Sequence, residues 1–248
     1  MTKPQRVAVI TGVAGGIGRA LAKTFALEGY HIIGIDRKKC HLPHAKCVTF
    51  DLARLHLWRT EAQEFIKNLQ LLCGGRVNAL VNNAAVQIVK PVAQVEPQDW
   101  DQTIAVNLLA PFWLTLRLLP QLQRSRGSVI NIASIHARLT KSNFGLYATS
   151  KAAIVGLTRS LSIELAPHVR VNAISPAATD TAMLRAGFQN ETERLLGLRK
   201  FHPLKRICTP RKIADAACFL ADERSRFTTG SDMVIDAGIG SLLHDPSN

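Results

Sequence analysis

Short apolar runs alternate along the chain with longer stretches in which apolar residues recur at helical spacing. Residues 7–10 are apolar and β-branched and run into a glycine turn, and residues 17–27 then place apolar side chains three and four positions apart. The same alternation predicts further strands at about 31–35, 47–50, 77–81, 128–132, 169–174 and 233–235, and helices at 57–72, 99–122, 147–166 and after Thr209. Pro111 is expected to bend the helix at 99–122, because proline has no backbone N–H.

Strands that alternate with helices predict an α/β fold. We expect a single-domain, Rossmann-like, doubly wound parallel sheet of about seven strands with helices on both faces. No repeat or shift in composition marks a boundary within the 248 residues, so the expected domain spans residues 1–248. Ligands of such sheets bind beyond the carboxyl ends of the strands. The residues that follow predicted strands, and should meet there, are Gly12, Asp36, Asn83, Ser134 and Pro176.

The turn after the first predicted strand carries Gly12, Gly16 and Gly18. Glycines let the backbone approach a phosphate, and the free N–H groups at a helix start favour an anion. Asp36 ends the second predicted strand, where an acidic residue meets the adenosine ribose of a dinucleotide. A carboxylate there accepts hydrogen bonds from ribose hydroxyls and repels a 2′-phosphate. The sequence therefore favours NAD over NADP, although the basic residues 37–39 could soften that exclusion.

Tyr147 and Lys151 lie four residues apart and share one face of the predicted helix. An ammonium beside a phenol favours the phenolate, so the pKa of the tyrosine is expected to fall from about 10 towards neutrality. Ser134 could hold the oxygen of a carbonyl or an alcohol beside that phenol. With a hydride carrier, these groups would interconvert C=O and CH–OH. In isolation, the same pair would be read as an ordinary aromatic and a solvated charge.

Several short motifs, in order and over nearly the whole chain, resemble the short-chain dehydrogenase/reductase family in its soluble single-domain branch. Besides Ser134, they are Thr11-Gly12-Val13-Ala14-Gly15-Gly16-Ile17-Gly18, Asp51-Leu52, Asn82-Asn83-Ala84-Ala85, Asn107, Tyr147-Ala148-Thr149-Ser150-Lys151, Arg170-Val171-Asn172-Ala173-Ile174-Ser175-Pro176 and Asp236-Ala237-Gly238. Each motif is weak alone, and the resemblance rests on their shared order and spacing.

The resemblance implies an NAD(H)-dependent oxidoreductase that interconverts a secondary alcohol and a ketone. Tyr147 would be the acid/base, Lys151 would lower its pKa and bind the nicotinamide ribose, and Ser134 would orient the substrate oxygen. The side chain of Asn107 would hold a water that links the lysine to solvent. The cofactor-binding residues implied are Gly12, Gly16, Ile17, Gly18, Asp36, Asp51, Leu52, Asn83, Tyr147, Lys151, Pro176, Thr179 and Thr181. The resemblance also implies a homotetramer, built through the helices at 99–122 and 147–166.

Three alanines depart from the family pattern. Ala85, Ala177 and Ala237 stand where the family commonly has glycine, and each added methyl group restricts positive φ. Ala85 and Ala177 are expected near the nicotinamide, so the departures bear on how the cofactor is positioned and leave the reaction class unchanged.

Substrate identity is expected to depend on residues 182–208, which the resemblance makes a substrate-covering segment. This segment mixes the apolar residues Met183, Leu184, Phe188, Leu195, Leu196 and Phe201 with the basic residues Arg185, Arg194, Arg199 and Lys200. It is either an amphipathic lid with a solvated charged face or an apolar pocket with a basic rim for a carboxylate or phosphate. His136, Asn143 and Phe144 are expected to line the same pocket.

The net charge of +13 keeps two alternative functions open. One is a 3-oxoacyl thioester reductase that uses NADPH and docks an acidic carrier protein; Asp36 argues against it. The other is a non-catalytic dinucleotide sensor that binds nucleic acid through a basic face. The intact Ser134, Tyr147 and Lys151 argue against lost catalysis, and the charges are dispersed along the sequence.

Cysteine usage and hydropathy point to the cytoplasm. Five scattered cysteines suit reduced thiols better than a disulfide framework. Residues 40–47 hold two cysteines and two histidines, but lysines 38, 39 and 46 would repel a cation, so no metal site is expected. We find neither a signal peptide nor a bilayer-spanning apolar stretch and expect a soluble, cytoplasmic protein with a small-molecule substrate.

Overall fold

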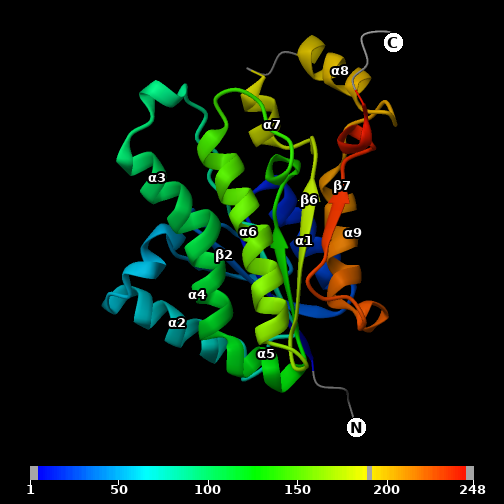
Figure 1. Cartoon of the computed structure of the whole chain (residues 1–248). Coiled ribbons are helices and arrows are strands. Elements are labelled where there is room, and N and C mark those ends of the chain that lie inside the picture. Colours follow the sequence, from blue (N-terminus) through cyan, green and yellow to red (C-terminus); the bar gives the residue numbers. More distant parts are fainter. Residues whose placement is uncertain (1–4, 189–191, 244–248) are drawn as a thin grey trace.

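A computed structural model describes residues 5–188 and 192–243 and contains one seven-stranded parallel sheet, in the order β3-β2-β1-β4-β5-β6-β7 (Figure 1). The strands are β1 (Arg6–Thr11), β2 (Tyr30–Asp36), β3 (Ala45–Thr49), β4 (Ala79–Asn82), β5 (Ser128–Ile132), β6 (Arg170–Pro176) and β7 (Asp232–Ile235). The helices are α1 (Gly16–Leu27), α2 (Thr60–Leu72), α3 (Pro97–Ile104), α4 (Ala110–Arg117), α5 (Leu119–Ser125), α6 (Gly145–Glu164), α7 (Ala182–Gly187), α8 (Thr192–Phe201) and α9 (Pro210–Ala221). The predicted α/β class and parallel, doubly wound sheet are confirmed.

Apolar side chains cover both faces of the sheet. On one face, α1 and α9 contribute Phe25 and Ile213; on the other, α2, α4 and α6 contribute Phe65, Leu114 and Leu161 (Figure 1). Every residue of β5 is buried, and its two polar side chains, Ser128 and Asn131, are hydrogen-bonded within the protein. Burial of each large apolar side chain stabilises the fold by roughly 1.5–3 kcal/mol.

The helix expected at 99–122 is divided. A π-helical turn at Ala105–Leu109 separates α3 from α4, and Ala110 donates its N–H to the carbonyl of Ala105. Pro111 in the first turn of α4 cannot donate to an earlier carbonyl, and a widened turn immediately precedes it. The sharp bend, 62°, lies instead between Arg117 and α5. The prediction of a bend at Pro111 was therefore wrong in position.

The remaining boundaries differ from the predictions by a few residues. The helix expected at 57–72 begins three residues later, because Leu57 ends a 3₁₀ turn, Leu52–Leu57, and α2 starts at Thr60. Asp51 caps that turn by accepting a hydrogen bond from the Ala53 N–H, and Trp58 ends it in a left-handed conformation with φ of 50°. Within the described residues no single helix is long and apolar enough to cross a membrane, whereas one bent helix pair, Pro97–Arg117 with Leu119–Ser125, has the length and composition to do so.

Candidate active site

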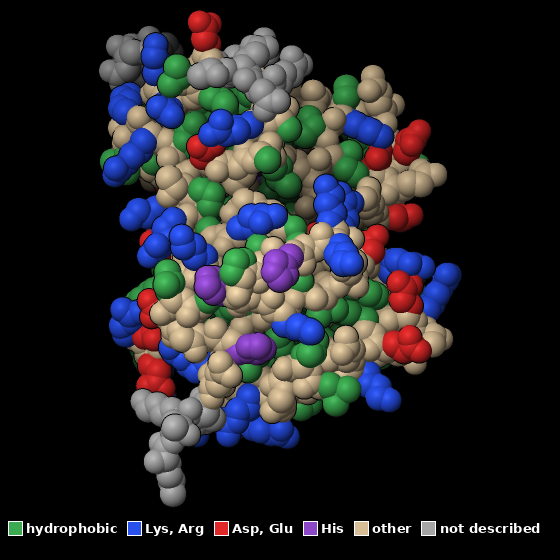
Figure 2. Space-filling view, turned by 180° about the vertical axis from the view of Figure 1, so that it is seen from behind, with side chains coloured by type: hydrophobic (Ala, Val, Ile, Leu, Met, Phe, Trp, Pro, Cys, Tyr) green, Lys and Arg blue, Asp and Glu red, His purple; other side chains and the backbone are tan. Residues whose placement is uncertain are grey.

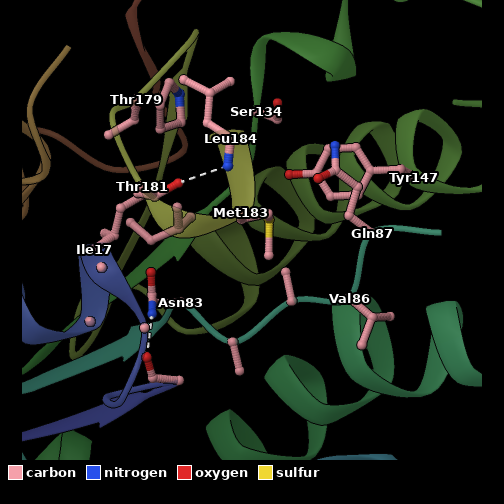
Figure 3. Close-up of a pocket in the computed structure, with 18 of the residues that line it drawn as sticks. Ile17, Asn83, Val86, Gln87, Ser134, Tyr147, Thr179, Thr181, Met183 and Leu184 are labelled. Carbon is pink, nitrogen blue, oxygen red and sulfur yellow. Dashed lines mark hydrogen bonds between the residues drawn. The ribbon is translucent and has the colours of Figure 1, made fainter. Parts of the chain in front are cut away.

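A cleft of about 660 Å³ lies beyond the carboxyl ends of the strands, where the sequence places its candidate residues (Figure 3). Tyr147 and Gln87 occupy one side of the view, and Ile17, Asn83 and Thr181 the other. Every residue predicted to bind the cofactor lines this cleft. Of the predicted catalytic residues, Asn107 alone does not line the cleft.

The glycine turn is held against the end of β4 by close backbone packing. Gly12 has φ of +66°, and a Cβ there would come within 2.8 Å of the Ala84 Cα. A Cβ on Gly18 would overlap the Gly12 carbonyl oxygen. Gly15 precedes α1 and has no side chain that could cap the helix. The N–H groups of the first helical turn therefore remain available to a ligand in the cleft. This arrangement is a site for an anion such as a pyrophosphate.

Asn83 shapes this turn. Its Nδ2 donates to the carbonyls of Thr11 at 2.9 Å and Gly12 at 3.2 Å, and its backbone N–H donates to Thr11 Oγ1 (Figure 3). Thr11 Oγ1 also accepts the Ala84 N–H at 2.9 Å. The Asn83 amide thus joins the ends of β1 and β4.

Asp36 ends β2 beside the glycine turn. Its Oδ2 accepts the Ala14 N–H at 2.9 Å and its Oδ1 accepts the Lys38 N–H at 3.0 Å. Each carboxylate oxygen keeps acceptor capacity for a further donor. The side chain can therefore accept a ribose hydroxyl while the turn fixes its orientation. Arg37 and Lys38 line the same part of the cleft.

The loop after Pro176 closes the opposite side. Thr179 is buried and donates to the Ala177 carbonyl at 3.1 Å, and Thr181 caps α7 by accepting the Leu184 N–H at 3.2 Å. A Cβ built on Gly16 would lie 3.0 Å from the Thr181 Cγ2, so this loop sits directly over the start of α1.

Ser134, Tyr147 and Lys151 come together as expected. Ser134 follows β5, and its hydroxyl lies near enough to Tyr147, in the first turn of α6, to lower the pKa of that phenol. Lys151, one turn later, is buried; its Nζ donates to the Ile132 carbonyl at 2.7 Å and lies 5.5 Å from the centroid of the Tyr147 ring. All three side chains line the cleft.

Burial shifts the two titrating groups of this cluster in opposite directions. It raises the pKa of Tyr147 to about 12, and the hydrogen bond with Ser134 offsets only part of that rise. It lowers the pKa of Lys151 to about 8. In this structure the tyrosine pKa therefore moves away from neutrality, opposite to the expectation, because burial penalises the phenolate and the ammonium is directed at the Ile132 carbonyl.

Asn107 lies behind the cleft wall. Its Oδ1 accepts the Val86 N–H at 2.9 Å, and its Nδ2 donates to the Val86 carbonyl at 3.0 Å and to Ser150 Oγ at 2.9 Å. Ser150 in turn donates to the carbonyl of Tyr147 at 2.8 Å. Both amide N–H groups are thus committed, and the Asn107 side chain joins the segment after β4 to α6. This arrangement differs from the water-holding side chain that the resemblance implied.

The expected lid residues divide between the cleft and the surface. Met183, Leu184 and Phe188 line the cleft, whereas Leu196 and Phe201 are exposed. The basic residues of the segment do not form its rim: Arg185 pairs with Asp180 at 2.8 Å, Arg199 and Lys200 are exposed away from the lining, and the side chain of Arg194 lies outside the described structure.

The lining residues that the sequence analysis missed include Gln87, Lys141 and His202. A lone lysine in a loop and a lone histidine after a helix have no motif, so only their position in space reveals them. Of the three residues expected between Ser134 and Tyr147, His136 lines the cleft. Asn143 and Phe144 do not, because Phe144 is buried beneath the His136 ring and Asn143 turns outward with φ of 71°.

Only one of the three alanine departures is strained. Ala237 follows β7 with φ of 55°, the left-handed region that glycine adopts at least cost. Ala85 and Ala177 have no positive φ, and Ala177 makes a regular backbone hydrogen bond to Ile235 at 3.0 Å. The added methyl groups therefore do not distort the cleft wall.

The cysteine and histidine segment at 40–47 brings two thiols together. The Sγ atoms of Cys40 and Cys47 lie 3.0 Å apart, and burial raises the pKa of Cys40 to about 11. In the described residues, no three His, Cys, Asp or Glu side chains converge as a set of metal ligands would.

Comparison with known proteins identifies similar chains throughout the length of this one. A family model described as enoyl-(acyl carrier protein) reductase matches residues 12–240. Human dehydrogenase/reductase SDR family member 4 is 30% identical over 247 residues, which cover 96% of this chain and 88% of the human protein.

Solved structures resemble the whole fold. Ligand-free aldohexose dehydrogenase from Thermoplasma acidophilum is 28% identical with a TM-score of 0.90, covering 98% of this chain and 97% of that one. A 4-hydroxyisoleucine dehydrogenase complexed with NADH is 28% identical with a TM-score of 0.84, covering 96% and 100%. A 3-ketoacyl-(acyl-carrier-protein) reductase from Brucella melitensis complexed with NADH is 28% identical with a TM-score of 0.83, covering 95% and 98%.

Proposed function

Because the chain belongs to the short-chain dehydrogenase/reductase family, we propose that it interconverts a secondary alcohol and a ketone with NAD(H), using Tyr147 as the acid/base. The observation that carries this proposal is the convergence of Ser134, Tyr147 and Lys151 on one wall of the cleft that the glycine turn and Asp36 also line. Two similar proteins, the 4-hydroxyisoleucine dehydrogenase and the Brucella reductase, are complexed with NADH.

The residues of the cleft fit a dinucleotide. The N–H groups at the start of α1 suit the pyrophosphate, and Asp36 keeps acceptor capacity for the adenosine ribose. Asp51, which keeps one carboxylate oxygen beyond its helix cap, would meet the adenine, and Thr179 and Thr181 would hold the carboxamide end. A bound nicotinamide would supply the hydride acceptor at its C4.

Each member of the cluster then has a role. In the oxidative direction Tyr147, as phenolate, takes the hydroxyl proton of the alcohol; in reduction it returns that proton. Ser134 orients the substrate oxygen by hydrogen bonding. Lys151 shares one face of α6 with Tyr147 and supplies the positive charge that favours the phenolate. Asn107 acts as a positioning residue, since its amide links Val86 in the cleft wall to α6 through Ser150.

Residues 182–208 form a substrate-covering segment in this proposal. Met183, Leu184 and Phe188 from the α7 region and Leu198 from α8 present apolar surface to the cleft. Figure 1 shows α7 and α8 above the arrowheads of β6 and β7, where a substrate would enter.

Replacement of the acid/base tests the reaction. Tyr147→Phe removes the hydroxyl that carries the proton and keeps the ring, so we expect turnover of secondary alcohols to fall by a factor of at least 1,000 while dinucleotide affinity stays within about threefold. Oxidation is followed by NADH absorbance over a panel of secondary alcohols, and affinity by fluorescence titration. Turnover of the variant near the wild-type rate would refute the role of Tyr147.

The same panel, repeated with NADP, tests the cofactor. Because a carboxylate repels a 2′-phosphate, we expect wild-type kcat/KM to favour NAD, and Asp36→Ser to lower the NAD/NADP ratio by at least 100-fold. Glu61→Ser, on the exposed surface of α2, is the matched control and should leave the ratio unchanged. A ratio indifferent to Asp36→Ser would show that the carboxylate does not select the ribose.

Reduction of a 3-oxoacyl thioester remains a second candidate. The Brucella relative carries that activity in its name and is complexed with NADH, so Asp36 no longer argues against this activity. NADH-dependent reduction of acetoacetyl-coenzyme A faster than that of simple ketones would favour it.

A further inference from the structure

The two ends of the cleft differ in charge. Among the described residues that line it, the carboxylates are Asp36 and Asp51, which follow β2 and β3. Ser134 and Pro176 lie at the ends of β5 and β6, on the other side of β1 and β4 in the sheet. Since neighbouring strands are about 4.8 Å apart, the carboxylates are more than 10 Å across the sheet from the reacting end. An anion bound beside Tyr147 would therefore meet little repulsion.

Lys141 supplies positive charge at the reacting end. It comes from the loop between Ser134 and Tyr147, and its Nζ lies 4.6 Å from the centroid of the Phe144 ring and 5.7 Å from that of Phe188. Contacts with aromatic faces hold an ammonium in place without neutralising it. Within the described part of the chain no carboxylate lies within 4.0 Å of this ammonium.

Stacked aromatic rings connect Lys141 to the catalytic tyrosine. The rings of His136 and Phe144 are parallel at 4.6 Å, and both meet the Tyr147 ring edge-on, at 5.6 and 6.3 Å. Lys141, His136 and Tyr147 all line the same cleft. A substrate that reaches Tyr147 with its hydroxyl can therefore extend a second polar group towards Lys141.

His202 is a second polar side chain on the wall of the cleft, and one of its two ring nitrogens is unpaired among the described residues. It is 2% exposed, and its Nδ1 lies 2.9 Å from the Leu198 carbonyl. A carbonyl only accepts, so Nδ1 carries the hydrogen, and Nε2 has no partner among the described residues. Buried polar atoms are almost always hydrogen-bonded, so this nitrogen can accept a hydrogen bond from a water molecule or from a polar group of a ligand in the cleft.

We propose that the substrate is a hydroxy acid, or the matching oxo acid, whose carboxylate binds Lys141 while its alcohol oxygen binds Ser134 and Tyr147. This inference rests on the proposed function. In oxidation, the carbinol C–H bond breaks with its electron pair leaving as hydride to the nicotinamide, the O–H proton goes to Tyr147, and the carboxylate is unchanged. One cation at this end of the cleft suits a carboxylate better than a phosphate dianion, which usually draws several cationic or N–H donors.

Paired substrates test the carboxylate. We expect wild-type kcat/KM to be at least tenfold higher for 2-hydroxybutanoate, 3-hydroxybutanoate or 4-hydroxypentanoate than for the methyl ester of the same acid. Lys141→Met should lower kcat/KM for the preferred acid by 10-fold to 100-fold, chiefly through KM, and change that for its ester less than twofold. Lys141→Arg should restore part of the loss. Lys67→Met, an exposed lysine on α2, is the charge-matched control and should change neither.

Binding of succinate provides a readout that does not need turnover. In the presence of NADH, calorimetry should detect succinate but not succinamide, and Lys141→Met should weaken succinate at least tenfold. Wild-type preference for the esters, or equal losses in Lys141→Met and Lys67→Met, would overturn the inference while leaving the alcohol dehydrogenase function intact. If no alcohol is oxidised but succinate binds through Lys141, the proposed function fails and the carboxylate site stands.

Discussion

At the scale of single residues, burial governs the titration of the candidate site. Tyr147 and Lys151 both lose solvent, and the loss penalises the charged form of each: the phenolate of one and the ammonium of the other. Alcohol oxidation needs the phenolate, so the pair must gain a stabilising interaction during the reaction. An ammonium released from the Ile132 carbonyl towards the phenol would supply it.

The lowered pKa of Lys151 predicts a pH dependence of stability. Between pH 8 and 10.5 the unfolded chain carries a proton on this lysine and the folded chain does not, so unfolding takes up a proton and the free energy of unfolding rises with pH. Below pH 8 both states carry the proton, so the cost of burying the ammonium does not change with pH. We expect the free energy of unfolding of wild type, relative to that of Lys151→Met, to rise by up to about 3 kcal/mol between pH 8 and 10.5. Urea unfolding at several pH values measures it, and a pH-independent difference would contradict the shift.

The residues that sequence alone could predict are those whose role depends on local spacing. Tyr147 and Lys151 follow from helical periodicity, and Gly12 and Asp36 from a strand that ends in a turn. Lys141 and His202 could not be predicted, because they come from two segments of unrelated sequence that only the fold brings to the same cleft. The direction of the Tyr147 pKa shift depends on burial, which spacing does not report.

At the scale of elements, the π-helical turn places Asn107 where one amide joins three pieces of chain. Asn107→Leu would leave both backbone groups of Val86 unpaired, so we expect the free energy of unfolding to fall by about 2–4 kcal/mol and kcat to fall with it. Ser150→Ala leaves Asn107 bound to Val86 and removes only the two bonds made by the serine hydroxyl, to Asn107 and to the Tyr147 carbonyl, so it should cost about 1–2 kcal/mol. Urea unfolding and steady-state kinetics of the two variants provide the comparison. Equal losses would show that Asn107 does not hold the Val86 segment.

The sequence predicted the types of the elements more accurately than the residues at which they begin and end. The apolar runs predict the central strands best, because strands such as β1 and β4 are buried along almost their whole length. The divided helix at 97–125 was not predicted. Where such a helix bends depends on packing against the sheet as well as on Pro111, and packing is not readable from periodicity.

At the scale of the whole molecule, α4 and α6 cover one face of the sheet with nothing packed over them in Figure 1. Ile154 and Leu161 are used in the protein's own core, but Leu116 on α4 and Ile163 on α6 are 41% and 79% exposed. These two helices therefore carry apolar side chains that the core of the protein does not bury.

We expect this face to be the tetramer interface that the family resemblance implies. Light scattering after size exclusion should give four times the chain mass of 27.1 kDa, and Leu116→Arg with Ile163→Glu should reduce it, since buried charge disfavours association. Leu71→Arg on α2, at a position 72% exposed, is the control and should leave the mass unchanged. A wild-type monomer would contradict the prediction.

On the face drawn in Figure 2 the basic side chains are scattered. Figure 2 shows Lys and Arg side chains interspersed with Asp and Glu on the face in view, without a continuous basic stripe. A nucleic-acid sensor needs such a footprint, so this face gives that alternative no support.

The widened turn at Ala105–Leu109 also bears on how the chain tolerates insertions and deletions. A π turn holds one residue more than an α turn, and each residue of a helix rotates the chain by about 100°. Deleting one residue there could restore regular α pairing, but it would turn α3 relative to α4 and carry Asn107 away from Val86. This single extra residue therefore sets the rotation of α3 relative to α4. Insertions and deletions should be tolerated in the loop before α3 and not within the π turn.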